Sequence, residues 1–332
     1  MALRVLYVMD PLSHVLVDKD TTFAFMLEGQ RRGHEQYSCG IEDLFIEKTV
    51  PHARARRTEV RRADVHYTLS EEWSCPLTWY DVVFMRKDPP FDMTFFFATQ
   101  VLGLVDPQVT LVVNDPRGLL LANEKLYALH FRNVIPESLV TAEPARLKAF
   151  MEALGGEMIV KPLDGCGGAG VFHLHRTDRN LNAILEMSTL NGTRLVMAQR
   201  YLVAVRESGD KRLIVLAGEP LGAIRRVPRE DESRGNIHVG GRVERSPVDD
   251  RDREICRVMA PRLASDGLYF VGLDVIGGYV TEVNVTSPTG VQEIDRLDGV
   301  CLEARVLDFV EERAARLERR AAHCDDSAVA AT

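Results

Sequence analysis

The segment from Gly272 to Thr289 constrains the fold of this chain more than any other. It consists of two short apolar runs around a Gly277-Gly278 turn, which predicts a β-hairpin. Its only acidic residues are Asp274 and Glu282, and Asn284 follows two positions later. Strand side chains alternate between faces, so Glu282 and Asn284 point the same way. These oxygen ligands suit a hard cation, Mg²⁺ or Mn²⁺. The alternative is a surface hairpin with a solvated polar face.

The metal hypothesis also predicts the turn. A two-residue loop would place Asp274 opposite Thr281 and leave Glu282 on the other face. A three-residue loop puts Asp274 and Glu282 on one face, and such loops commonly contain glycine and a bulge. We therefore expect a three-residue loop.

The bulk properties exclude several classes of protein. The chain has 332 residues, which favours two or three domains, and its net charge of −8 gives no global footprint for nucleic acid. No apolar run approaches the roughly 20 residues of a membrane span, and the N-terminal apolar stretch is too short for a signal peptide. Six cysteines without CxxC spacing favour free thiols in a reducing cytoplasm.

The first third of the chain predicts an open, parallel α/β domain. Residues 3–9 form an apolar strand, and Asp20 and Gly33 have the chemistry of helix caps around Thr21–Arg32. Further expected elements are strands Asp81–Met85 and Thr110–Val113 and helix Met93–Leu104. Residues 52–68, rich in Arg and His without clear periodicity, predict an irregular segment.

The remainder predicts short strands that alternate with glycine-rich loops. The strands expected are 158–161, 170–175, 194–199, 212–217 and 221–227, and the helices expected are 123–132, 144–154, 247–266 and 299–319. The polar segment 228–241 predicts a mobile lid, and the tail from Arg320 predicts disorder.

A glycine loop follows Lys161 and contains Gly165, Gly167, Gly168 and Gly170. Glycines let backbone N–H groups approach an anion, and the Lys161 ammonium can meet a phosphate. A strand, not a helix, is expected after the loop, so neither a Walker A loop nor a dinucleotide fingerprint applies. The alternative is a tight turn beside an incidental lysine.

Several cations lie near expected strand ends. Arg86 and Lys87 end a strand of the first domain, where open α/β sheets bind ligands, and could receive a substrate carboxylate. Other cations cluster around the expected lid at Lys211, Arg212, Arg225, Arg226 and Arg234. The alternative is a solvated charged surface. The segment Thr286–Gly290 has N-cap chemistry, which also presents N–H groups to an anion; capping alone would explain it.

Many strings occur in the order typical of one family. They are MDP at 9–11, EGQRRGH at 28–34, MRKDPPFD at 85–92, NEKL at 123–126, KPLDGCGGAGVF at 161–172, MAQRYL at 197–202, GDKR at 209–212, ESRGN at 232–236, GGR at 240–242, FVGLDVIG at 270–277 and TEVNVTSPTG at 281–290. With them the chain resembles prokaryotic glutathione synthetase, of the ATP-grasp superfamily, over roughly residues 3–316. Residues 46–75 diverge most from the sequence pattern of this family.

The resemblance implies an ATP-grasp fold after an N-terminal open parallel α/β domain. The implied division is 1–122 for the substrate domain, 123–200 for the small subdomain, 201–318 for the large subdomain and 319–332 for the tail. It implies ligation of glycine to γ-glutamylcysteine with ATP, in a cytoplasmic homotetramer.

The resemblance also implies residue roles. ATP would be held by Lys125, Lys161, Gly165, Gly167, Gly168, Gln199, Tyr201, Leu202 and Asp210. Mg²⁺ would be held by Asp274, Glu282 and Asn284, and Arg212 would approach the transferred phosphate. Arg226 and Arg234 would act with Arg212 in catalysis. Substrate binding or lid closure would involve Arg86, Arg226, Arg234 and Ser287. The choice between Arg225 and Arg226 stays open.

The implied chemistry agrees with these residue types. A carboxylate becomes electrophilic as an acyl phosphate, and phosphoryl transfer needs cations and positioning rather than a nucleophilic side chain. Such an intermediate must be kept from water, which gives the expected lid a purpose. The alternatives are another ATP-grasp carboxylate–amine ligase, adding glutamate or D-alanine, and a catalytically silent ATP-binding module.

Overall fold

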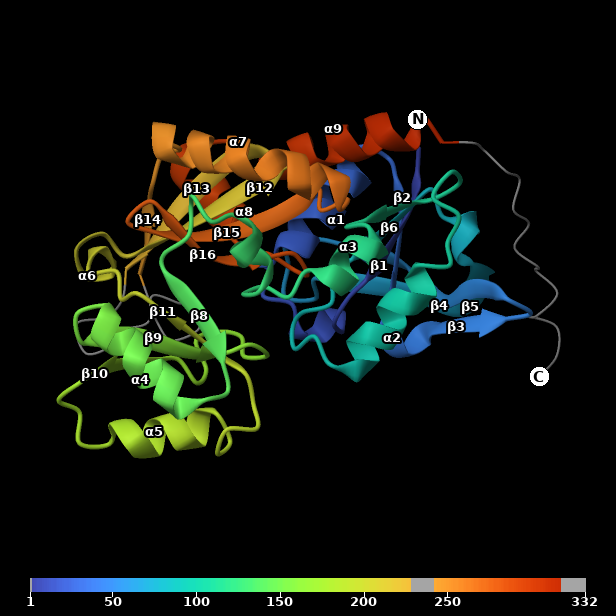
Figure 1. Cartoon of the computed structure of the whole chain (residues 1–332). Coiled ribbons are helices and arrows are strands. Elements are labelled where there is room, and N and C mark those ends of the chain that lie inside the picture. Colours follow the sequence, from blue (N-terminus) through green and yellow to red (C-terminus); the bar gives the residue numbers. More distant parts are fainter. Residues whose placement is uncertain (1, 228–241, 318–332) are drawn as a thin grey trace.

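The computed structural model describes residues 2–227 and 242–317. Within them the strands form three sheets of seven, four and five strands (Figure 1). The expected lid at 228–241, with Arg234, and the expected tail at 319–332 lie outside the described residues.

The seven-stranded sheet contains the parallel part that the sequence predicts. Its parallel strands run in the order β2-β1-β6-β7, and the apolar residues of β1, β6 and β7 are almost all buried, as expected for a parallel sheet covered on both faces. They span Glu35–Cys39 (β2), Arg4–Val8 (β1), Val82–Met85 (β6) and Leu111–Val113 (β7). Asp20 caps α1 (Thr21–Arg31) by accepting the Phe23 N–H at 2.7 Å, and Gly33 follows the helix with φ +80°. Both cap predictions are confirmed.

Three antiparallel strands extend this sheet beyond β2. They are β3 (Leu44–Glu47), β4 (Val50–Val60) and β5 (Tyr67–Pro76). The prediction of an irregular segment at 52–68 is therefore wrong. Along β4 the buried positions are small, with Ala53 and Ala55 inward, while Arg54 and Arg56 point outward and pair with Asp43 and Glu72.

The four-stranded sheet has a core of its own. Its order is β10-β9-β11-β8, with strands at Phe172–His175, Glu157–Pro162, Val196–Gln199 and Ser138–Thr141. Helices α4 (Pro144–Ala153) and α5 (Leu181–Ser188) cover one face, and Leu147, Val160 and Leu185 belong to one buried cluster (Figure 1). This unit therefore packs independently of the other two sheets.

The five-stranded sheet shares its core with the N-terminal sheet. Its order is β14-β13-β12-β15-β16, with strands at Arg242–Arg245, Glu219–Val227, Asp210–Leu216, Phe270–Ile276 and Tyr279–Asn284. Leu6 of β1 and Leu213 of β12 belong to one buried cluster. The buried Asn114 side chain donates to the carbonyls of Phe270 and Val285 at 2.8 Å each. The two sheets thus form one body that faces the smaller unit across a cleft.

The remaining helices differ in part from expectation. They are α2 (Met93–Leu102), α3 (Pro116–Leu121), α6 (Ala204–Ser208), α7 (Asp250–Ser265), α8 (Val291–Asp298) and α9 (Leu302–Ala314). The sequence analysis missed α3, α5 and α6, and the helix expected over 123–132 is only a 3-10 turn at Tyr127–His130. Among the helices of 2–227 and 242–317, none combines the length and the apolar character that a membrane crossing needs.

The cysteines are described at five of their six positions. Cys39, Cys166, Cys256 and Cys301 are free thiols. Cys75 is disulfide-bonded, so the prediction that all cysteines are free is wrong there.

A carboxyl pair at the α8–α9 junction predicts a pH-dependent stability. Burial, then a hydrogen bond with Glu303, raises the pKa of Asp295 to about 8. The unfolded value is about 3.9. The folded chain therefore holds this proton more tightly than the unfolded chain does. The resulting stabilisation is complete below about pH 4 and is lost as the pH rises to about 8.

We expect Asp295→Asn to remove this dependence. The amide can still accept the Leu302 N–H, which meets Asp295 Oδ1 at 2.8 Å, and can donate to Glu303 without titrating. We measure the free energy of unfolding in urea for the variant and the wild type at pH 5 and at pH 8. The difference between them, variant minus wild type, should be larger at pH 8 than at pH 5. An equal difference at both pH values would contradict this.

Candidate functional site

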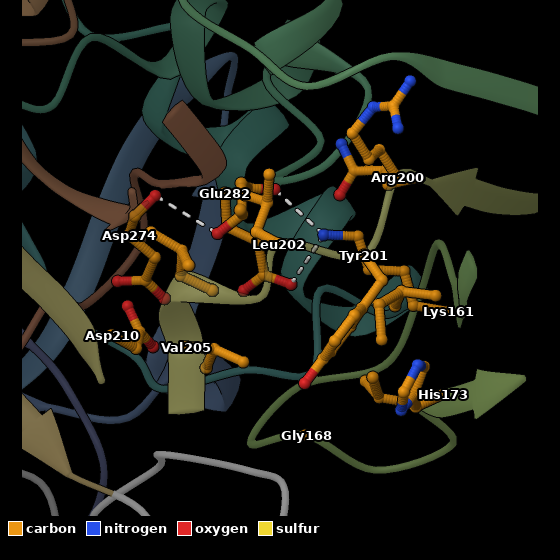
Figure 2. Close-up of a pocket in the computed structure, with 15 residues that line it drawn as sticks. Lys161, Gly168, His173, Arg200, Tyr201, Leu202, Val205, Asp210, Asp274 and Glu282 are labelled. Atoms are coloured by element: carbon orange, nitrogen blue, oxygen red, sulfur yellow. Dashed lines mark hydrogen bonds and ion pairs between the residues drawn. The ribbon is translucent and has the colours of Figure 1, made fainter. Parts of the chain in front are cut away.

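The cleft between the four- and five-stranded sheets collects most of the predicted nucleotide and metal residues (Figure 2). The predicted residues that line it are Lys161, Gly168, Gln199, Tyr201, Leu202, Asp210, Asp274 and Glu282. Apolar side chains of the lining include Ile159, Val171, Leu202 and Val205. The cleft is therefore lined by both apolar and charged side chains.

The β15–β16 hairpin places the two predicted metal carboxylates together. Asp274 pairs directly across from Glu282, so both lie on one face, and Gly272 pairs with Asn284 on the same face. The expected three-residue loop is wrong: Ile276 pairs with Tyr279 around a two-residue Gly277-Gly278 turn with positive φ at both glycines. A bulge makes up the difference, because Thr281 is an extra residue in β16.

Asp274 is buried between two arginines. Its carboxylate meets Arg212 Nε at 2.6 Å and Arg226 Nη2 at 3.0 Å. Burial opposes ionisation, but Arg212 and then Arg226 outweigh it and lower the pKa of Asp274. Arg226 also pairs with Asp210 of β12, where burial dominates and raises the pKa of the carboxyl.

The pairing settles which of two adjacent arginines faces the cleft. Arg226 is buried, whereas Arg225 is half-buried and forms no ion pair with any described residue. Neighbouring residues of a strand point to opposite faces, so only Arg226 reaches the two acids.

Glu282 lies between two buried lysines. Its Oε1 is 3.6 Å from Lys125 Nζ and 3.5 Å from Lys161 Nζ. Lys161 also donates to the Thr281 carbonyl at 2.9 Å, and Lys125 donates to the Gly165 carbonyl at 2.6 Å. Burial lowers the pKa of Lys161, and Glu282 opposes that effect. Each ammonium is thus held where a phosphate oxygen could meet it.

Asp274 and Glu282 provide two carboxylates for a hard cation at this hairpin. Further ligands would have to come from the Asn284 amide, water or phosphate oxygens. No three His, Cys, Asp or Glu side chains of 2–227 and 242–317 gather closely enough to hold a metal ion. Asn284 donates through Nδ2 to the Gly272 carbonyl at 3.2 Å, which leaves its carbonyl oxygen as a possible ligand beside Asp274 and Glu282. Carboxylate and amide oxygens suit Mg²⁺, which also keeps waters and phosphate oxygens as ligands.

The glycine loop joins β9 to β10 on the other wall. Gly167, Gly168 and Gly170 have φ of +62°, +82° and +71°, conformations that side chains rarely allow. Gly165 is tied to Lys125, as described above. The loop therefore needs its glycines to hold its shape beside the cleft.

Several lining residues were missed by the sequence analysis. They are Ile159, Val171, His173, Val205, Ile276 and Thr281. His173 stacks on Tyr201 with ring centroids 3.8 Å apart and contacts Glu157 at 3.0 Å. Glu124, inside the NEKL string, was also missed; burial, then Glu282, raises its pKa to about 7. The sequence could have indicated Glu124, because it is a charged residue directly before the predicted nucleotide ligand Lys125.

Two of the predicted substrate residues, Arg86 and Ser287, lie at the segment after β16. Arg86 is 4% exposed, donates to Thr22 Oγ1 at 3.0 Å and to the Pro288 carbonyl at 3.1 Å, and thus joins the first domain to this segment. Ser287 is half-buried in the same segment. The expected Ser or Thr cap is wrong, because α8 begins after Gly290, with φ +122° and no side-chain cap.

Comparison with known proteins gives consistent matches. The family model "Prokaryotic glutathione synthetase, N-terminal domain" matches residues 3–119, and "Prokaryotic glutathione synthetase, ATP-grasp domain" matches 124–299. A glutathione synthetase of Gloeobacter violaceus is 49% identical over 93% of this chain and 97% of its own length. One of Brucella melitensis is 47% identical over 94% of this chain and 100% of its own.

Solved structures resemble the chain in fold. A D-cycloserine synthetase aligns with a TM-score of 0.63 at 18% identity, covering 93% of this chain and 99% of its own. An ATP-grasp ligase complexed with a precursor peptide and AMPPNP aligns with a TM-score of 0.61 at 19% identity, covering 94% and 98%. Together with the ATP-grasp model match, these alignments establish the ATP-grasp fold behind an N-terminal α/β domain.

Proposed function

The chain belongs to the prokaryotic glutathione synthetase family, and we infer that it joins glycine to γ-glutamylcysteine with ATP, releasing ADP and phosphate. One structural observation on this chain supports the proposed function. Lys125, Lys161, Arg212 and Arg226 converge on the carboxylates of Asp274 and Glu282 in a single cleft.

This set suits formation of an acyl phosphate on the cysteine carboxylate of the dipeptide. Transfer of a phosphoryl group requires neutralisation of its oxygens and alignment of the two reactants. Arginine offers a planar fork for phosphate, and Arg212 already lies beside Asp274. The glycine amine then attacks the acyl carbon, the peptide bond forms and phosphate leaves.

A divalent cation, Mg²⁺ or Mn²⁺, would be held by Asp274, Glu282 and Asn284. When bound it would neutralise phosphate oxygens during transfer. The shared face of Asp274 and Glu282 supports this assignment. In the same proposal Arg212 and Arg226 orient and neutralise the carboxylates and phosphates that enter the cleft.

We propose the remaining roles on position in the cleft and on the family strings. The nucleotide would contact Lys125, Lys161, Gly165, Gly167, Gly168, Gln199, Tyr201, Leu202 and Asp210. The other substrates would contact Arg86, Arg226, Arg234 and Ser287, of which Arg234 lies outside the described residues. The division at residues 122 and 200 is supported by the separate core of the four-stranded unit. A cytoplasmic homotetramer is proposed on family resemblance alone.

Release of ADP in a coupled assay tests this function. The full rate should require γ-glutamylcysteine and glycine together, so omission of either should remove steady turnover. An equal rate when glutamate or D-alanine replaces glycine would overturn the assignment in favour of another ligase.

Arg86→Lys tests the proposed contact with a substrate carboxylate. We expect a higher KM for one carboxylate substrate and an unchanged KM for ATP, because lysine cannot reproduce a bidentate contact. The loss should be roughly 1.5–3 kcal/mol. If Arg86 only braces Thr22 and Pro288, the melting temperature should fall while every KM stays constant.

A further inference from the structure

The connection between β11 and α6 joins the two sheets that form the cleft. It runs from Arg200 to Val203, leaving the four-stranded sheet and leading through α6 into the five-stranded sheet. Tyr201 of this connection is 8% exposed and, like Leu202 beside it, lines the cleft where the nucleotide is proposed to bind (Figure 2). The position of Tyr201 therefore shapes one wall of the nucleotide site.

Backbone hydrogen bonds do not fix Tyr201. Among the described residues, neither its N–H group nor its carbonyl has a hydrogen-bond partner. Before it in the chain, the Arg200 N–H donates to the Glu137 carbonyl at 2.9 Å. After it, the Val205 N–H donates to the Leu202 carbonyl at 3.0 Å. Side-chain contacts must therefore hold Tyr201 in place, and its backbone groups remain available to a ligand.

Two side chains contact the Tyr201 ring. His173 stacks on it, with ring centroids 3.8 Å apart and planes 15° apart. The guanidinium carbon of Arg206 lies 5.4 Å from the centre of the same ring, but Arg206 is an exposed residue of a five-residue helix. Stacked aromatic rings stabilise each other beyond the area that they bury. The stack with His173 is therefore the contact that best fixes the ring.

His173 is itself held on a strand. It lies in β10, where it pairs with Ile159 of β9, and its Nε2 is 3.0 Å from Glu157 Oε2. Strand β10 begins directly after the glycine loop. The stack thus joins the strand that ends the glycine loop to the connection that carries Tyr201. Both of these segments belong to the proposed nucleotide site.

We propose that His173 is a positioning residue for the nucleotide, which acts through Tyr201. Its imidazole holds the Tyr201 ring, and with it the unpaired backbone of the connection, in the arrangement that the nucleotide needs. A site that is already ordered loses less conformational entropy when its ligand binds. The inference rests on the proposed function through the nucleotide contacts assigned to Tyr201 and Leu202.

Two substitutions of His173 separate the ring from the hydrogen bond. His173→Phe keeps a ring that can stack on Tyr201 but loses the contact with Glu157. His173→Gln can keep that contact but has no ring. The matched control is His175→Gln, because His175 is an exposed residue of the same strand and contacts Thr177 at 2.7 Å instead of Tyr201.

Calorimetric titration with ADP and Mg²⁺ measures nucleotide affinity without turnover. We expect His173→Gln to weaken ADP binding roughly 3- to 10-fold, the loss that removal of an aromatic pair produces. His173→Phe and His175→Gln should bind ADP as the wild type does. In steady-state kinetics, His173→Gln should raise the KM for ATP by a similar factor. Its kcat and its KM values for γ-glutamylcysteine and glycine should stay unchanged.

The other outcomes overturn the proposal in distinguishable ways. Equal ADP affinity in His173→Gln and the wild type would show that the stack does not serve the nucleotide. A loss in His173→Phe as large as that in His173→Gln would assign the effect to the Glu157 contact. A lower melting temperature with every KM constant would make His173 a residue of stability alone. An enzyme that binds ADP as expected but forms no peptide bond would refute the proposed function and not this inference.

Discussion

Glu282→Ala is expected to lower kcat about 10²- to 10³-fold at saturating Mg²⁺. The substitution removes a proposed cation ligand from the face that it shares with Asp274. It also removes the carboxylate between Lys125 and Lys161, so two buried ammonium groups lose the charge that positions them. Phosphoryl oxygens would then meet both a weaker cation site and misplaced lysines. Steady-state ADP release measures the effect.

Glu219→Ala is the control for this variant. Glu219 is an exposed carboxylate at the start of β13, in the same sheet as Glu282 but away from the cleft. Its loss should leave kcat near the wild-type value. A Glu282→Ala enzyme that kept most of its kcat, with the control normal, would contradict the cation assignment.

The second large effect is expected for Arg226→Ala, with a kcat loss of about 10²- to 10³-fold. Arg226 is the only described cation that forms an ion pair with Asp210, and it shares Asp274 with Arg212. Breaking a buried pair typically costs about 3–5 kcal/mol. We expect the lower end, about 3 kcal/mol in the free energy of unfolding, because Arg212 still neutralises Asp274.

Arg225→Ala separates the role of the site from a general loss of positive charge. The two arginines are adjacent in β13 and carry the same charge, but their side chains lie on opposite faces. Kinetics and urea unfolding should show a near-normal Arg225→Ala enzyme beside an impaired and destabilised Arg226→Ala enzyme. Similar losses in both variants would show that long-range charge, not the buried ion pairs, matters.

The parts of the fold that sequence predicted are those set by local chemistry. The strand at 3–9 and the caps at Asp20 and Gly33 depend on a buried apolar run, an N-cap hydrogen bond and a positive φ, all encoded within a few residues. The helix expected over 123–132 failed because its residues instead make long-range contacts: the Val283 N–H donates to Glu124, and Lys125 reaches Glu282.

The β4 strand was missed because its alternation is hard to see in the sequence. The inward residues Ala53, Ala55 and Thr58 are small or polar, and an irregularity in pairing between Arg56 and Thr58 shifts the period. A strand is recognised in a sequence by the alternation of apolar and polar residues. Here the inward residues are barely apolar, so the segment looks uniformly polar and rich in arginine.

In the candidate site, the family strings indicated which residues belong to the site but not which of them contact one another. Nothing in the strings could show that Glu282 lies between two lysines, or that His173 stacks on Tyr201, because each contact joins separate elements. The choice of Arg226 over Arg225 likewise required the register of β13 against β12.

The bulge at Thr281 makes one contact of the site depend on the number of residues in β16 and not on the identity of a side chain in the hairpin. Thr281 reaches Lys161 through its backbone carbonyl, which every amino acid possesses. An alanine scan across the hairpin would therefore pass over this contact without a signal. Within the hairpin, only a change in the number of residues in β16 would remove it, so a deletion series in β16 tests what substitutions there cannot.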